Sequence, residues 1–204
     1  MAANIIVPKI QVKQITPTVR VWTDSGSGAD KDGSFWTASE TQLQNDFKLL
    51  GEISCIGSYS NACHSMILVQ DSGENILVEP IRTEVIWTDA GSGADSDVTI
   101  YRLIPPSDQY KCLGGAVVAS LASQPDLSKY RCVKVDYLKD VGLDAIAWDD
   151  RGSGAWRSFA AYNIAVTDQT VAIGTFYGVD NYNIDATLIS VSVPSLKKDQ
   201  VVFI

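Results

Sequence analysis

One eight-residue segment occurs three times in this chain and constrains the fold more than any other feature. It reads WTDSGSGA at residues 22–29, WTDAGSGA at 87–94 and WDDRGSGA at 148–155. The tryptophans that open the three copies are 65 (87−22) and 61 (148−87) residues apart. These intervals exceed the roughly 20–45 residues of a solenoid repeat and the about 40–45 of a propeller blade. The chain is therefore expected to contain three large, similar units.

Short apolar stretches between turn-forming residues predict an almost entirely β structure. A strand leads into each Gly-Ser-Gly turn and another resumes after it, as at 18–22 and 33–37. Alternating polarity and β-branched residues favour strands at these places. No window of ten or more residues keeps the 3.6-residue apolar period of a helix, and residues 39–50 come nearest to holding a short one.

Three repeats of about four strands each predict a β-prism, in which three antiparallel sheets surround a pseudo-three-fold axis. A β-trefoil-like arrangement is the alternative, because it also divides by three. We expect one all-β domain over residues 1–204, with repeats at about 4–62, 63–125 and 126–193 and a closing strand at 194–204. The first strand is expected at 4–12, and a late copy of it at 185–193.

The charge and hydropathy of the chain argue against several classes of partner. A formal net charge of −8 repels nucleic-acid phosphates and anionic headgroups at long range, so no nucleic-acid partner is expected, while a local basic patch stays open. No segment approaches the roughly 20 apolar residues of a transmembrane span. The N-terminal residues lack the regions of a signal peptide. A soluble cytoplasmic protein is expected, with release by a non-classical route left open.

The four cysteines are Cys55, Cys63, Cys112 and Cys132. They lack the C-x-x-C spacing of a zinc site. Reduced, half-buried strand residues are the favoured interpretation. Pairing stays open as the alternative, with Cys112 and Cys132 as the better candidates.

Three features together resemble a known family. They are the W-x-D-x-G-S-G-A turns, the YKCLG stretch at 110–114 and the YRCVKVD stretch at 130–136. The family is that of vacuolar protein sorting-associated protein 62, and the resemblance covers the chain from Trp22 to about Tyr177. This family is similar to the β-prism modules of multivesicular-body proteins and to the C-terminal prism of some bacterial perforin-like proteins. The resemblance implies a non-enzymatic β-prism that docks on membranes.

The first two turns share a ladder of aspartates and glycines that suits a hard cation. Ca²⁺ binds carboxylate and carbonyl oxygens, so calcium is the one candidate cofactor that the sequence suggests. The favoured interpretation is nevertheless turn chemistry, in which each Asp accepts backbone N–H groups, and the cation site is the alternative. The third copy carries Trp156 and Ser158 at two of the acidic positions, so shared chemistry is expected only in the first two. The candidate metal ligands are Asp24, Asp30, Asp32, Asp89, Asp95 and Asp97.

The tryptophans fall into two groups. Trp22, Trp87 and Trp148 hold equivalent positions before the turns, where rings packed on the prism axis are expected. Trp36 and Trp156 break the repeat and are expected to be exposed, and exposed rings beside carboxylates bind sugars. The candidate ligand-binding residues are Asp24, Gly26, Ser27, Gly28, Asp30, Asp32, Trp36, Asp89, Gly91, Ser92, Gly93, Asp95, Asp97, Asp150 and Trp156.

Catalysis finds little basis in the sequence. The single histidine, His64, follows Cys63 on an expected strand, where neighbouring side chains point to opposite faces and cannot form a dyad. We expect no enzyme and no catalytic residue. The expected function is a binding module that recognises a cell-surface glycan or glycolipid through the loops at the turns, with cation assistance left open. The alternatives are docking on membrane lipid in targeting, toxin or defence systems, and a structural scaffold.

Overall fold

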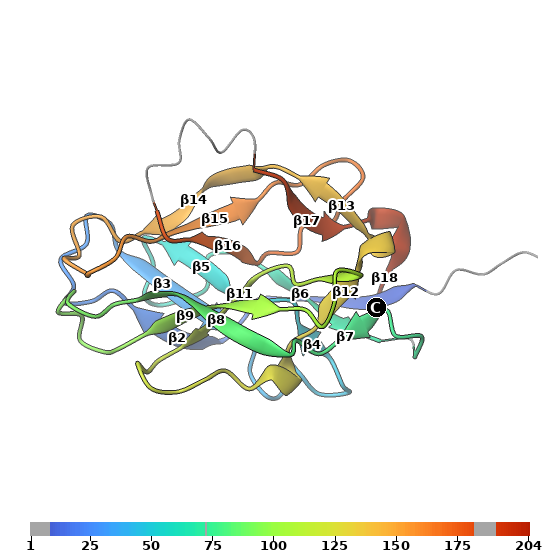
Figure 1. The fold of residues 1–204 in the computed structure, drawn as a ribbon, viewed down its shortest axis with the longest axis horizontal. Coiled ribbons are helices and arrows are strands. Elements are labelled where there is room, and N and C mark those ends of the chain that lie inside the picture. Colours follow the sequence, from blue (N-terminus) through green and yellow to red (C-terminus); the bar gives the residue numbers. More distant parts are fainter. Residues whose placement is uncertain (1–8, 72, 182–190) are drawn as a thin grey trace, which may run out of the picture.

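The repeated turns and their strands form a three-sided β structure (Figure 1). It is a computed structural model that describes residues 9–71, 73–181 and 191–204. We refer to the three sides as face one, face two and face three, in chain order. Each face has one half next to the repeated turns and one half away from them.

Face one is built from six short strands. The half next to the turns is a three-stranded sheet in which β3 pairs antiparallel with β2 and β5. In the other half, β6 pairs antiparallel with β1 and β4. Each half of the face thus has one central strand, β3 or β6, with one strand on either side of it. The bounds are β1 (Ile10–Ile15), β2 (Val19–Thr23), β3 (Gly33–Thr37), β4 (Lys48–Leu49), β5 (Ile53–Ile56) and β6 (Met66–Gln70).

Face two repeats this pattern strand for strand. Its central strand β9 pairs antiparallel with β8 and β11, and β12 pairs antiparallel with β7 and β10. Strand β6 pairs within face one, although it comes after the expected repeat boundary at 62/63. In the same way, β12 pairs within face two, although it comes after the expected boundary at 125/126. The bounds are β7 (Leu77–Val78), β8 (Arg82–Thr88), β9 (Thr99–Ile104), β10 (Tyr110–Lys111), β11 (Gly115–Val118) and β12 (Cys132–Lys134).

Face three follows the same plan with one strand reduced to a single bridge. Its central strand β15 pairs antiparallel with β14 and β16, and β17 pairs antiparallel with β13. Thr170 forms an isolated bridge with Lys197, at the place that β4 and β10 occupy in the other faces. The bounds are β13 (Leu138–Val141), β14 (Leu143–Asp149), β15 (Ala160–Ile164), β16 (Phe176–Val179) and β17 (Val193–Leu196).

The remaining elements are short. Strand β18 (Val201–Phe203) runs parallel to β1 and closes face one. Single 3₁₀ turns occur at η1 (Leu127–Lys129), η2 (Val135–Tyr137) and η4 (Lys198–Gln200). Within the described part of the chain, no helix has the length and apolar character needed to cross a membrane. Three antiparallel faces with the same pairing pattern confirm the predicted β-prism.

The core lies along the axis on which the three faces meet. Near the turns, the rings of Trp22, Trp87 and Trp148 pack edge to face with centroids 6.2, 5.7 and 6.0 Å apart. Edge-to-face packing suits the positive edge and negative face of aromatic rings. All three tryptophans are buried, as predicted. A second apolar cluster, including Ile10 and Leu196, fills the half away from the turns.

Residues 39–50 contain turns at 40–46 and strand β4, and not the short helix that the sequence left room for. The backbone N–H groups of Gln42 and Leu43 both donate to the carbonyl of Ser39, which closes only one turn. Asn45 and Asp46 then adopt φ angles of 62° and 65°. Two successive residues in the left-handed region stop a right-handed helix. The chain continues directly into β4.

The favoured interpretation of the cysteines as reduced thiols was wrong. Cys55 is bonded to Cys63 and Cys112 to Cys132, with Cα atoms 5.6 and 4.1 Å apart. The second pair is the one that the sequence favoured if pairing occurred. Residue spacing did not reveal these pairs. Cys63 reaches Cys55 because the chain turns back after β5, and Cys112 reaches Cys132 because β10 pairs with β12.

Two sequence expectations concern segments that reach beyond the described residues. The first strand was expected at 4–12, and the described part of it begins with Ile10, the first residue of β1. The strand expected at 185–193 falls largely on residues 182–190, which lie outside the described part of the chain. Its last residue, Val193, opens β17.

Candidate functional site

Three loops that follow the repeated tryptophans lie together at one end of the prism. We call them loop 1 (24–32), loop 2 (89–97) and loop 3 (150–158), and the end that they form the apex. In Figure 1 they are the blue, green and orange loops at the left end of the molecule. Nearly all the predicted ligand-binding residues belong to these loops.

Each loop is closed by the aspartate of its W-x-D motif. The carboxylates of Asp24, Asp89 and Asp150 accept the backbone N–H nine residues further on, at 2.8, 2.8 and 2.7 Å. All three carboxylates are buried, and burial is the main cause that raises the pKa of Asp89 and of Asp150. The W-x-D aspartates therefore have a structural role, which is the turn chemistry that the sequence favoured over a cation site.

The serine and glycines of each motif complete the turn. Ser27 and Ser92 are buried, and their hydroxyl oxygens accept the N–H of Ala29 and Ala94 at 3.1 Å. The glycines are exposed and adopt left-handed φ angles between 76° and 91°, which other residues adopt only with strain. The glycines in the first two loops are Gly26, Gly28, Gly91 and Gly93.

The three loops are joined into a closed ring by equivalent hydrogen bonds. The backbone N–H groups of Asp30, Asp95 and Trp156 donate to a carbonyl of the neighbouring loop, on Arg151, Ser25 and Ala90 respectively, at 2.7, 2.8 and 3.0 Å. The indole N–H groups of Trp22, Trp87 and Trp148 donate to the carbonyls of Ser96, Arg157 and Lys31, at 2.6, 2.7 and 2.9 Å. Each loop is thereby bound to both of the others.

One side chain of each loop lies over a glycine of the next loop. A Cβ atom on Gly26 would be 2.6 Å from a carboxylate oxygen of Asp95, and one on Gly152 would be 2.5 Å from Asp30. At the third place the neighbour is an indole, because a Cβ atom on Gly91 would be 2.4 Å from Nε1 of Trp156. Trp156 still exposes 83% of its surface. The apex therefore has two carboxylate contacts and one aromatic contact.

Trp36 does not belong to the apex, and its predicted exposure was wrong. Only 5% of its surface is exposed, and its indole N–H donates to the hydroxyl of Ser34 at 2.7 Å. Trp36 packs in a cluster with Ala38 and Phe47 from the segment after β3. That segment folds back over the outer side of β3, so both sides of the strand are buried. Position outside the repeat was not a sufficient sign of exposure.

Tyr59 is a part of the apex that sequence reasoning missed. Its hydroxyl donates to Asp24 at 2.5 Å and lies 3.2 Å from a carboxylate oxygen of Asp32. Burial, and then the two carboxylates, raise the pKa of Tyr59. Tyr59 lies in the loop after β5, 35 residues from Asp24, and no sequence signal connects the two.

The remaining acidic candidates are exposed. Asp30 and Asp32 lie on loop 1, and Asp95 and Asp97 lie on loop 2. Within residues 9–71, 73–181 and 191–204, the one group of three potential metal ligands with atoms within 4.8 Å of one another is Cys55, Cys63 and His64. Two of these residues form a disulfide. Calcium binding by the acidic loops stays a prediction.

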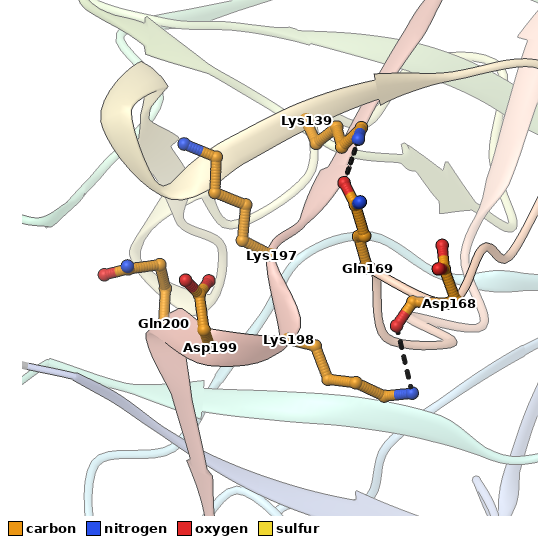
Figure 2. Close-up of a pocket in the computed structure, with 7 residues that line it drawn as sticks. All are labelled: Lys139, Asp168, Gln169, Lys197, Lys198, Asp199 and Gln200. Carbon is orange, nitrogen blue, oxygen red and sulfur yellow. Dashed lines mark hydrogen bonds between the residues drawn. The ribbon is translucent and has the colours of Figure 1, made fainter.

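A basic pocket of about 440 Å³ lies beside β13 and the turn after β17 (Figure 2), and these elements are away from the apex in Figure 1. Its cationic residues are Lys139, Lys197 and Lys198, and its acidic residues are Asp168 and Asp199. Lys139 is hydrogen-bonded to Gln169, and the other two ammonium groups donate to backbone carbonyls. All three partners are neutral groups, and three lysines against two aspartates give the pocket a formal charge of +1 on an acidic protein.

Comparison with known proteins agrees with the fold and the motif. The structure is similar to that of GNIP1Aa from Chromobacterium piscinae, with a TM-score of 0.81 and 28% sequence identity. The match covers 96% of this chain and 38% of GNIP1Aa, so this chain spans well under half of that protein. The curated proteins include no match. The model of the family described as vacuolar protein sorting-associated protein 62 matches residues 1–203, and the chain belongs to this family.

Proposed function

We propose that this domain is a non-enzymatic binding module that recognises a cell-surface glycan or glycolipid at the apex. The observation that carries the proposal is Trp156, a large aromatic side chain with 83% of its surface exposed. Its backbone N–H is bound to Ala90 and its indole rests over Gly91. An indole face that is held in place and open to solvent suits stacking against the apolar face of a sugar ring.

The surroundings of Trp156 supply the polar half of such a site. Asp30 and Asp95 occupy the equivalent positions in the other two loops and are exposed. Their carboxylates accept hydrogen bonds, as sugar hydroxyls require. The ring of inter-loop hydrogen bonds holds these groups before a ligand arrives, so little conformational freedom would be lost on binding.

A cation would have to be held by the exposed carboxylates. Asp24 and Asp89 already accept backbone N–H groups, and Asp24 also accepts the hydroxyl of Tyr59. Asp30, Asp32, Asp95 and Asp97 are exposed and are the candidate ligands for Ca²⁺, and of these Asp32 and Asp95 each also accept one side-chain hydroxyl, from Tyr59 and Ser25. We therefore include calcium in the binding experiment as a variable.

Three further observations support a non-enzymatic binding module, and one of them also supports a location outside the cytosol. Cys63 is oxidised in a disulfide and offers no thiol beside His64, which supports a function without nucleophilic catalysis. Two disulfides are typical of proteins in oxidising compartments. The similarity to 38% of GNIP1Aa also supports a prism that serves as one module of larger proteins.

A glycan array with purified protein tests the proposal, in calcium and again in a chelator. We expect selective binding that Trp156→Ala lowers at least tenfold, since the stacking surface is lost. Gly91→Ala should lower binding as well, because the added Cβ displaces the indole. Gly57→Ala is the matched control, because Gly57 has a left-handed φ of 72° but no atom within 4 Å of an added Cβ.

Two results would count against a glycan site at the apex. One is the absence of a signal on the array in either condition, and the other is full binding by Trp156→Ala. A loss of signal in the chelator would assign a part to calcium, and Asp30→Asn with Asp95→Asn should reproduce that loss.

The basic pocket supports a second candidate function, which is docking on anionic lipid. Lys139, Lys197 and Lys198 could contact a phosphate or carboxylate headgroup. Sedimentation with liposomes that contain phosphatidylserine should retain the wild-type protein and release Lys139→Gln/Lys198→Gln. Equal binding to neutral liposomes would contradict this function.

A further inference from the structure

A second cavity, of about 430 Å³, opens at the seam between face one and face two. Its size falls within the range of small-molecule sites. One wall comes from β2, β3 and the turn that follows, and the other from the end of β11 and the segment around η1. Much of the wall is apolar, with Val19, Leu43, Leu49, Val118 and Pro125.

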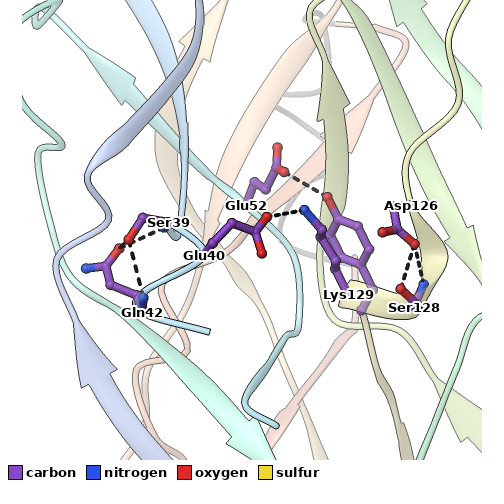
Figure 3. A network of polar contacts seen from close by, with 8 residues as sticks. Ser39, Glu40, Gln42, Glu52, Asp126, Ser128 and Lys129 are labelled. Carbon is purple, nitrogen blue, oxygen red and sulfur yellow. Dashed lines mark hydrogen bonds and ion pairs between the residues drawn. The ribbon is translucent and has the colours of Figure 1, made fainter. Parts of the chain in front are cut away.

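The cavity contains a buried acid, Glu52. Only 3% of its surface is exposed. One carboxyl oxygen of Glu52 accepts the hydroxyl of Tyr130 at 2.8 Å (Figure 3), and the other accepts the N–H of Val117 at 2.9 Å. A carboxylate offers about four acceptor positions. Even with a further hydrogen bond from the side chain of Thr37, Glu52 keeps room for one more donor.

The charges around the cavity do not compensate Glu52. Lys129 is paired with Glu40 at 2.5 Å (Figure 3), and both residues line the cavity together with Glu52. The carboxylate of Asp126 accepts hydrogen bonds from the N–H and the hydroxyl of Ser128, at 3.1 and 2.6 Å. The groups that face the cavity are therefore one cation, Lys129, and two exposed carboxylates, which together carry −1. Ionised Glu52 would bring the total to −2.

Burial without a dedicated counter-charge makes ionisation of Glu52 costly. Burial is the largest effect on this carboxyl and raises its pKa from 4.5 to about 7, against the opposite effects of Tyr130, Thr37, Val117 and Lys129. A buried charge is stabilised when an opposite charge comes within a few ångströms. A cationic ligand would supply this charge and would favour the ionised form.

We propose that this cavity binds a small organic cation, in which a primary ammonium group pairs with Glu52 and an apolar chain lies against Val19 and Leu43. The site is distinct from the apex, and it stands whether or not the apex binds a glycan. The ammonium group donates to the free position of the carboxylate, and the apolar walls bury the rest of the ligand. The same geometry disfavours carboxylic acids, because they would bring two negative charges together.

Calorimetric titration with three probes of equal chain length tests the site. The probes are hexylammonium, hexanol and hexanoate, at pH 7.5. We expect hexylammonium to bind at least tenfold more tightly than hexanol, and hexanoate to bind least. The preference for hexylammonium over hexanol should grow between pH 5.5 and pH 8, since Glu52 ionises in that interval while the probes do not change charge.

The variant Glu52→Gln keeps the size of the side chain and removes its charge. Its amide can accept the N–H of Val117 and donate to the hydroxyl oxygen of Tyr130, so folding should be preserved. It should bind hexylammonium and hexanol equally, while the exposed Glu79→Gln should behave as the wild type. Absence of hexylammonium binding, equal binding of both probes by the wild type, or an unchanged preference in Glu52→Gln would overturn the proposal. If Glu52→Gln does not fold, the pH dependence of the wild type decides.

Discussion

At the scale of single residues, Glu52 makes the stability of the protein depend on pH. Its pKa is about 7 in the folded protein and 4.5 in the reference state, so the folded state binds the proton more tightly. The free energy of unfolding should therefore be highest below pH 4.5 with respect to this group, and should fall as the pH rises to about 7. The difference of 7−4.5 corresponds to roughly 3 kcal/mol.

Urea unfolding at pH 5 and pH 8 measures this effect. Glu52→Gln cannot ionise, so the variant should lose less stability than the wild type between the two values, by up to about 3 kcal/mol. Glu79→Gln should follow the wild type, because Glu79 is exposed. An identical pH dependence in Glu52→Gln and the wild type would show that another group causes it.

At the scale of elements, the short strands of face two depend on a covalent link. β7 and β10 contain two residues each and β12 contains three, and few ladder hydrogen bonds hold them. The disulfide between Cys112 and Cys132 joins the end of β10 to the start of β12. The disulfide therefore keeps β10 and β12 paired in the half of face two away from the turns, where the strands are only two or three residues long.

Removal of this disulfide should loosen the same half of face two. Cys112→Ala/Cys132→Ala opens a loop of 20 residues, and we expect a loss of about 3 kcal/mol in the free energy of unfolding. Hydrogen exchange at Lys111 and Val133 should become faster. Cys55→Ala/Cys63→Ala is the comparison, since its loop spans only 8 residues and should leave these amides protected. Unchanged exchange at Lys111 would contradict a stabilising role for the link.

At the scale of the whole molecule, one aromatic core connects the faces with the apex. Trp148 is fully buried against Trp22 and Trp87, and its indole N–H binds the carbonyl of Lys31 in loop 1. In the middle of the prism, the N–H of Glu52 donates to Gly115 at 3.0 Å, and the N–H of Phe176 donates to the carbonyl of Glu52 at 3.2 Å. All three faces are thus linked to one another at more than one level.

A pair of identical substitutions tests the importance of this core. Trp148→Phe removes buried volume and leaves the Lys31 carbonyl without its donor, so a loss of about 2–4 kcal/mol is expected. Trp156→Phe changes an exposed ring and should shift the free energy of unfolding by less than about 0.5 kcal/mol. Denaturant titration measures both, and similar losses in the two variants would refute the axial packing.

The repeat and the turn chemistry were open to prediction from the sequence alone. Three copies of one motif predicted three faces around an axis, because equivalent tryptophans bury equivalent surfaces by meeting there. Strand periodicity and left-handed glycines are local properties, so the all-β structure and the Gly-Ser-Gly turns followed from neighbouring residues. The exposure of Trp156 was also predicted, from its departure from the repeat.

Only the tertiary structure decided what each side chain meets. Trp36 is buried because the segment after β3 folds back, Cys55 and Cys63 are bonded because the chain returns after β5, and the acid at Glu52 meets Tyr130 from 78 residues away. The carboxylate of Asp95 reaches Gly26 of another loop in the same way. The physical reason is that such contacts depend on how loops fold back and how the three faces pack against one another. The spacing of residues along the sequence of one face does not determine that packing.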